Sequence, residues 1–211
     1  MALPAIALFL QFKLSHRLER ATARHAFRIG LPYYRFELRP LKHSDQHNLL
    51  LALERAANLV YYAAPEFHRT IELNEAFATR TVVARSAFFK PSDIGALPDN
   101  DEHYVAFRVG SIQSWMFSEP RPLERHSFHD VFETDLAARL GSSPHLASTD
   151  FFTGIANTLL DAYERAQPKR QPHIDLGALR SSSSLSDPAR YAQFLSLILF
   201  GCQLLVLVGS P

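Results

Sequence analysis

The feature that most constrains the fold is an apolar run ending in a Gln-x-Lys motif, residues 5–13 (AIALFLQFK). Strand geometry fits this run better than a helix, because the side chains of a strand alternate between two faces. Gln11 and Lys13 then project to one side, while Leu10 and Phe12 pack on the other. An amide oxygen and an ammonium group placed together at a strand end can hold a divalent cation and a phosphate.

The segment LFLQFK resembles the third core strand of the PD-(D/E)xK, or restriction-endonuclease-like, nucleases, in the variant where Gln replaces the acidic residue. The resemblance implies that Gln11 faces a Mg²⁺ ion shared with an upstream Asp. It also implies that Lys13 orients the attacking water or offsets developing charge. The expected function is hydrolysis of DNA phosphodiesters in prokaryotic defence, with DNA and other subunits of a defence system as partners.

Residues 1–10 contain no Asp or Glu, so the upstream acid of the family is missing from the sequence. A hard cation needs more oxygen ligands than one neutral amide supplies. Three explanations stay open: the natural start lies before Met1, a distant acid folds into place, or the site is inactive. Glu37, Asp45 and His47 are the other candidate residues. The alternative function is a catalytically inactive nuclease-fold module that binds or acts as a scaffold.

Basic side chains are concentrated near the motif. Residues 1–43 contain eight basic and two acidic side chains, whereas residues 44–211 contain 14 and 19. A helix is predicted from Leu14 to about Phe27, in which Arg17, Arg20, Arg24 and Arg28 recur every three or four positions and form one stripe. The stripe would suit a phosphate backbone, and a solvated helix face is the alternative interpretation.

Cysteine content and hydropathy bear on the compartment. The single cysteine, Cys202, excludes an internal disulfide and a cysteine-based zinc site and is typical of a reducing cytoplasm. The apolar run 191–208 is slightly short for a membrane span and contains two glutamines, so a buried core segment is preferred. His126, His129 and Asp130 are candidates for a metal site, but two histidines that span a helix cap converge poorly on one ion. Ser127 and Asp130 instead predict the capped start of a helix.

The pattern of strands and helices predicts an α/β fold, a mixed central sheet flanked by helices with a largely helical C-terminal portion. We expect a nuclease-like core over residues 1–120 and a helical portion over 121–211, packed on the same core and containing a loop at 167–187. Strands are predicted at 33–38, 58–65, 81–89, 103–109, 112–117 and 202–208. Helices are predicted at 45–56, 65–78, 127–140, 151–165 and 188–200, the last with Asp187 as its N-cap and Gly201 just past its end.

Overall fold

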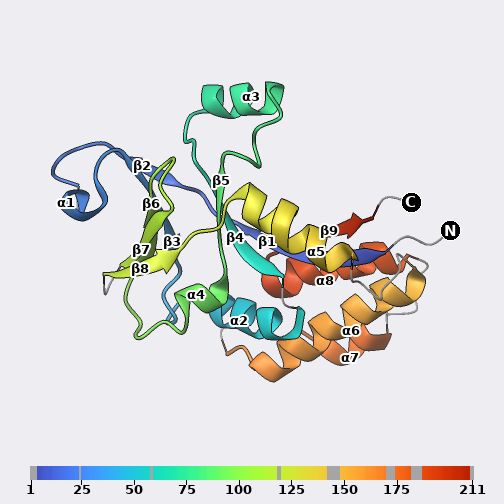
Figure 1. The fold of residues 1–211 in the computed structure, drawn as a ribbon. Helices are drawn as coiled ribbons and strands as arrows, with labels where there is room; N and C mark the ends of the chain where they lie inside the picture. The colour runs from blue at the N-terminus through green and yellow to red at the C-terminus, as the bar shows by residue number, and fades with distance from the viewer. Residues whose placement is uncertain are drawn as a thin grey trace. The chain divides into compact units, whose positions relative to one another are not determined.

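The structure, a computed structural model, describes residues 4–23, 25–57, 59–117, 120–141, 148–169, 174–181 and 187–209. The strands are β1 (Ala5–Phe12), β2 (His16–Leu18), β3 (Tyr33–Leu38), β4 (Val60–Pro65), β5 (Ser86–Phe89), β6 (His103–Phe107), β7 (Gln113–Phe117), β8 (Arg121–Glu124) and β9 (Gln203–Val208) (Figure 1). The helices are α1 (Ala26–Ile29), α2 (Gln46–Ala57), α3 (Thr70–Ala78), α4 (Pro91–Ile94), α5 (Ala137–Gly141), α6 (Thr149–Ala166), α7 (Leu176–Ser181) and α8 (Pro188–Phe200), with a π-helix at His129–Leu136.

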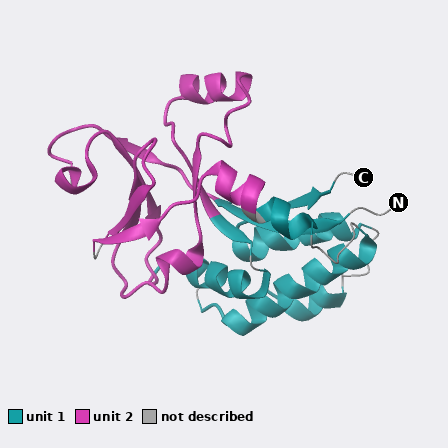
Figure 2. Ribbon diagram, viewed as in Figure 1, with its two compact units in different colours: residues 1–11, 43–61, 135–211 teal, residues 12–42, 62–134 magenta. Residues whose placement is uncertain are grey.

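These elements form two sheets with flanking helices, so the predicted α/β fold class is confirmed. One sheet has the strand order β5-β4-β1-β9 and the other has the order β2-β3-β6-β7-β8. The chain divides into two compact units (Figure 2). Unit 1 comprises residues 1–11, 43–61 and 135–211, and unit 2 comprises residues 12–42 and 62–134.

Unit 1 combines helices with the pairing of the first and last strands. β1 and β9 are antiparallel, in a register that runs from Ala5 opposite Val208 to Leu10 opposite Gln203. Helix α6 packs against both α2 and α8. Their apolar faces are sealed by leucines with no exposed surface, such as Leu53 on α2. Burial of this kind, rather than helix propensity, stabilises helices of such length.

The last helix begins and ends as its sequence predicts. Asp187 is the N-cap of α8 and its carboxylate accepts a hydrogen bond from the backbone N–H of Arg190, with Pro188 in the first turn. Gly201 ends the helix with φ of 65°, a conformation that glycine adopts without steric cost. The run 191–208 is therefore divided between α8 and β9. Among the described residues no helix is both long and apolar enough to cross a bilayer.

Unit 2 is built on the antiparallel five-stranded sheet. In β3, Phe36 is fully buried, whereas Arg35 and Glu37 on the opposite face are not. The Phe36 ring lies 5.8 Å from that of Tyr62 on β4 and 5.7 Å from that of Phe89 on β5, between ring centroids. One face of the sheet thus packs on an aromatic core, and the opposite face carries Arg35 and Glu37.

The predicted helix from Leu14 to Phe27 is wrong. Residues 16–18 form strand β2 instead, with Arg17 opposite Tyr34 on β3, and α1 begins only at Ala26 and covers four residues. Leu14 is 83 % exposed, Leu18 packs against a small apolar cluster that includes Tyr33 and Phe117, and the edge of β3 offers backbone hydrogen bonds to residues 16–18. Tertiary pairing thus overrides helix propensity here. Arg24 lies outside the described residues.

Smaller differences concern element ends. Helix α3 begins at Thr70 instead of Pro65, because Glu72 accepts hydrogen bonds from the backbone N–H groups of His68 (2.9 Å) and Arg69 (3.0 Å) and fixes the start there. β5 is confined to Ser86–Phe89, the expected helix at 127–140 is a π-helix followed by α5, and β8 and α7 were not predicted. Other predicted elements are confirmed to within a few residues.

Candidate functional sites

In unit 1, Gln11 is held by a second glutamine. Its Oε1 accepts a hydrogen bond of 2.6 Å from Nε2 of Gln46, the first residue of α2. A Cβ atom at position 201 would lie 3.0 Å from Gln46 Nε2 and 3.3 Å from Gln11 Oε1. Gly201 therefore leaves room for the amide pair, in addition to ending α8.

Two other candidates, Asp45 and His47, flank Gln46, and both are buried. Burial raises the pKa of the Tyr163 hydroxyl on α6, and the Asp45 carboxylate adds to the rise. The structure thus brings Gln11 to a segment that contains a buried carboxylate and a buried imidazole. Nothing in the spacing of Asp45 and His47 in the sequence places their segment beside Gln11.

In unit 2, Lys13 follows β1. Its backbone N–H donates a 2.9 Å hydrogen bond to the Ala63 carbonyl, and its Nζ lies 5.2 Å from the centroid of the Tyr62 ring. Lys13 is half-buried, which fits an ammonium group resting on an aromatic face. Glu37 is exposed on β3.

The described arginines of the expected stripe lie in different environments. Arg17 forms an ion pair of 2.9 Å with Glu19. Arg20 is exposed in the turn after β2, and Arg28 stacks over the Trp115 ring at 5.4 Å. They remain basic groups of one unit, but no helix aligns them.

A cavity of about 360 Å³ lies on the face of the unit 2 sheet opposite its aromatic core. Its walls include His25, Tyr33, Arg35, Tyr104, Ala106 and Phe117. The rings of His25 and Phe117 are stacked, with centroids 3.8 Å apart. Burial raises the pKa of Tyr33, and the positive charge of Arg35 opposes that rise.

Arg35 is the conspicuous polar group of this cavity. Its Nε is buried and has no hydrogen-bond partner among the described residues. Its guanidinium carbon lies 4.5 Å from the centroid of the Tyr104 ring, and the small side chain of Ala106 occupies the opposite register position. An arginine in this position is oriented by stacking while its hydrogen-bonding capacity is kept.

Charged side chains of both signs also line the cavity. Lys42, Asp101 and Glu102 line it and are exposed. The Tyr104 hydroxyl donates a 2.5 Å hydrogen bond to the Glu102 carboxylate. That hydrogen bond, followed by burial and the negative charge of Glu102, raises the pKa of Tyr104.

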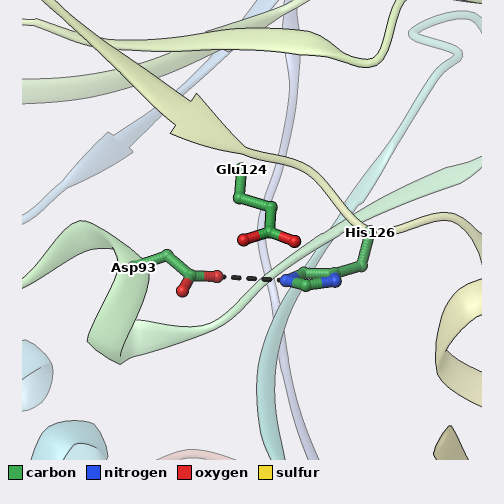
Figure 3. A group of neighbouring side chains, drawn as sticks. All are labelled: Asp93, Glu124 and His126. Carbon is green, nitrogen blue, oxygen red and sulfur yellow. Dashed lines mark hydrogen bonds and ion pairs between the residues drawn. The ribbon is translucent and has the colours of Figure 1, made fainter.

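A second polar group in unit 2 contains Asp93, Glu124 and His126 (Figure 3). One ligand atom from each residue lies within 4.8 Å of the other two, and His126 Nε2 is 3.0 Å from an Asp93 oxygen. In Figure 3 the Glu124 carboxylate points toward this pair. Two carboxylates and one imidazole, completed by water, form a ligand set that suits a divalent cation.

Backbone interactions fix two members of this group. His126 exchanges two backbone hydrogen bonds with Phe88 of β5, of 2.9 and 3.1 Å. The Arg121 guanidinium donates to the carbonyls of Asp93 and Ile94 and holds the short helix α4 against β8. The sequence suggests a different set of neighbours for His126, namely His129 and Asp130.

That earlier grouping of His126, His129 and Asp130 does not form in the structure. His129 pairs with Glu133 at 2.6 Å, and the Asp130 carboxylate accepts a 2.7 Å hydrogen bond from the backbone N–H of Ser127. The capping interpretation of Asp130 is therefore confirmed.

Sequence reasoning did not single out Arg35, Tyr104, Asp93 or Glu124. The alternation of residues 33–38 did place Tyr33 and Arg35 on one side of a strand. The sequence does not predict the pairing of β3 with β6, which brings Tyr104 and Ala106 to the same face of the sheet as Arg35.

Comparison with protein-family models, with curated proteins and with solved structures gives no match to this chain.

Proposed function

We propose that the chain acts on DNA as a restriction-endonuclease-like protein that hydrolyses phosphodiesters with Mg²⁺, in a prokaryotic defence system. The observation that carries the proposal is the hydrogen bond between Gln11 and Gln46. It connects the Gln-x-Lys motif to a segment with a buried carboxylate, Asp45. This supports the explanation in which a distant acid folds into place.

We infer a magnesium ion from the residue types of this segment. Mg²⁺ keeps several water ligands and usually takes one or two carboxylates together with substrate phosphates. In this proposal Gln11 contributes its amide oxygen and Asp45 its carboxylate. These two residues would hold the ion, which when bound polarises a phosphoryl oxygen.

Lys13 would provide the positive charge at the reacting phosphate. Lys13 follows Gln11 by two positions in the sequence, the spacing of the Gln-x-Lys motif. The ammonium group would hold the attacking water and offset developing charge. Arg17, Arg20 and Arg28 would contact phosphates of the DNA backbone, which the positive excess of residues 1–43 also supports.

A second candidate function is a binding or scaffold module without catalysis. This function is favoured because residues of the proposed site already form hydrogen bonds and ion pairs with other residues of the protein. Gln46 occupies one lone pair of Gln11, and Glu19 neutralises Arg17. In this case binding to DNA persists and cleavage does not occur.

A cleavage assay separates the two functions. Plasmid DNA and a structured RNA are incubated with the protein and Mg²⁺ or Mn²⁺, and products are followed by electrophoresis. Lys13→Ala and Asp45→Asn are each expected to slow metal-dependent cleavage about 100-fold, the scale of losing one charge-stabilising group. Lys169→Ala, a change at an exposed lysine of unit 1, is the matched control and should leave the rate unchanged.

Glu124→Gln locates the metal. If this variant loses cleavage while Asp45→Asn retains it, the centre is the group in Figure 3 and the Gln11 proposal is wrong. If no cation supports cleavage but wild-type protein binds DNA in a salt-sensitive manner, the binding module is correct. Absence of both cleavage and binding overturns both functions.

A further inference from the structure

Asp93, Glu124 and His126 of unit 2 form a group of metal-ligating side chains that the proposed cleavage does not use (Figure 3). Asp93 lies on α4, whereas Glu124 ends β8 and His126 follows two residues later. One ligand atom of each residue lies within 4.8 Å of the other two, and His126 Nε2 is 3.0 Å from an Asp93 oxygen. Two ligands bonded to one zinc ion at about 2.1 Å are about 3–4 Å apart, so these atoms lie close to the spacing of a coordination sphere.

The negative charge of this group is not neutralised by an arginine or a lysine of the described residues. The Glu124 carboxylate points toward the Asp93–His126 pair and makes no hydrogen bond or ion pair of its own within the described part of the chain. Arg121 donates to two backbone carbonyls of α4 and to the Met116 sulfur, and to neither carboxylate. Two carboxylates beside a neutral imidazole carry two negative charges, which one divalent cation would balance.

The backbone that carries the three side chains is held in place by the fold. His126 is buried and exchanges two backbone hydrogen bonds with the buried Phe88. Glu124 lies opposite Gln113 in the pairing of β8 with β7, and the hydrogen bonds of Arg121 hold α4. Ligands fixed in this way lose little conformational entropy when an ion binds. Because the Glu124 side chain is exposed, an ion can reach the group from solution.

We propose that this group binds Zn²⁺ through Asp93, Glu124 and His126, with water completing the coordination. The imidazole nitrogen favours a transition metal, because Mg²⁺ and Ca²⁺ prefer sites made of oxygen alone, and Zn²⁺ binds such mixed ligands more tightly than Mn²⁺ does. Three protein ligands leave a position open, as in zinc sites that carry water rather than in closed structural ones. The proposal is separate from the Mg²⁺ assigned to Gln11 and does not depend on cleavage.

Calorimetric titration tests the proposal with the full chain, after treatment with a chelator and without nucleic acid. Zn²⁺, Mn²⁺ and Mg²⁺ are the probes. One equivalent of Zn²⁺ should bind, at least about ten-fold more tightly than Mg²⁺, because only the transition metal gains from the imidazole. Equal affinity for Zn²⁺ and Mg²⁺ would mean that His126 is not a ligand and would overturn the assignment. Absence of saturable binding at submillimolar Zn²⁺ would reject it as well.

Variants locate the ion. Glu124→Gln removes a charge at an exposed side chain and should weaken Zn²⁺ at least about ten-fold, the smallest loss usual even for residues that only support a metal ligand. Glu75→Gln, the same change at an exposed glutamate of α3, is the matched control and should have no effect. Zn²⁺ affinity that is unchanged in both Glu124→Gln and Asp93→Asn rejects the proposal. If Asp45→Asn loses Zn²⁺ while Glu124→Gln keeps it, the ion belongs to the Gln11 group instead.

The histidine rings give a readout that a change in stability alone would not produce. The chain has ten histidines, so their ring-proton NMR signals separate one specific site from scattered binding. The signals of His126, assigned with His126→Gln, should shift on addition of one equivalent of Zn²⁺, and those of the exposed His129 should not. Similar shifts of several histidines, or no shift of His126, would contradict the proposal. Should His126→Gln fail to fold, Glu124→Gln at its exposed position decides.

Discussion

Arg125 and Arg35 both lie in unit 2, and both stack on an aromatic ring, but their hydrogen bonding differs. Arg125 donates to the carbonyls of Arg108 (2.6 Å) and Ser111 (2.9 Å) and forms an ion pair with the Glu66 carboxylate. Arg35 has a buried Nε without a partner among the described residues and faces a cavity. The first guanidinium is held by carbonyls and a carboxylate, whereas the second is held by its stack on Tyr104.

The difference separates a charge that the fold pairs with a carboxylate from one whose Nε has no partner among the described residues. Arg125 connects the segment after β4 to the loop between β6 and β7, and the side chains of the ion pair are about one-tenth exposed. Burial raises the pKa of Glu66, although the charge and hydrogen bond of Arg125 oppose the rise. Desolvation of this pair is thus substantial, and neither partner can be removed alone without leaving the other uncompensated.

The largest effect is expected for Arg125→Met. The variant leaves Glu66 buried without its partner, and breaking a buried pair in this way costs about 3–5 kcal/mol. Urea unfolding of unit 2, followed by the fluorescence of Trp115, measures the loss. The double variant Glu66→Leu with Arg125→Met should recover most of it, because no charge is then left behind. A loss below about 1 kcal/mol would contradict a structural role.

His126→Ala is expected to have an intermediate effect. The largely buried imidazole of His126 pairs with the half-buried carboxylate of Asp93. The imidazole is largely buried and contacts the Asp93 carboxylate at 3.0 Å. Losing this buried hydrogen bond should cost about 1–3 kcal/mol in the same unfolding experiment. His129→Ala is the matched control, because that side chain is 69 % exposed although it also pairs with a carboxylate. Equal losses in the two variants would show that burial does not govern the cost.

The contrast between the arginines also marks what the sequence could and could not predict. The fold class, the strand at residues 5–12 and the capped helix α8 follow from periodicity and capping residues, which are local signals. The helix expected at 14–27 failed because residues 16–18 pair with the edge of β3, and pairing with a distant strand leaves no local signature. Propensity alone could not foresee that competition.

The candidate sites depend on such distant pairing even more. Asp45 reaches the neighbourhood of Gln11 through Gln46, across 35 positions of sequence. Asp93, Glu124 and His126 converge because β5 bridges to His126 and Arg121 holds α4. In the sequence each of these residues resembles an ordinary cap or surface charge. Arg35 Nε has no partner among the described residues because of how the surrounding side chains pack, which residue spacing does not predict.

Arg35→Met tests whether Arg35, unlike Arg125, contributes little to the stability of unit 2. Methionine keeps an apolar contact with Tyr104 and removes a donor that has no protein partner, so unfolding free energy should change by no more than about 1 kcal/mol. The measurement is the urea titration used for Arg125→Met. If Arg35→Met costs as much as Arg125→Met, then the fold requires both arginines and the distinction drawn between them is wrong.

Two carboxylates of unit 2 have pKa values that move in opposite directions. Backbone hydrogen bonds, led by that from His68, lower the pKa of Glu72 from 4.5 to about 2, whereas burial raises that of Glu66. A lowered pKa contributes stability that is fully present above pH 4.5 and is lost as the pH falls toward 2. Glu72→Gln should therefore cost about 1 kcal/mol of unfolding free energy at pH 7, the scale of a helix cap.

Between pH 5 and 3 the urea midpoint of the wild type should fall toward that of Glu72→Gln. Glu75→Gln, on the same helix, is the control, and a gap between wild type and Glu72→Gln that is constant from pH 7 to pH 3 would refute the assignment.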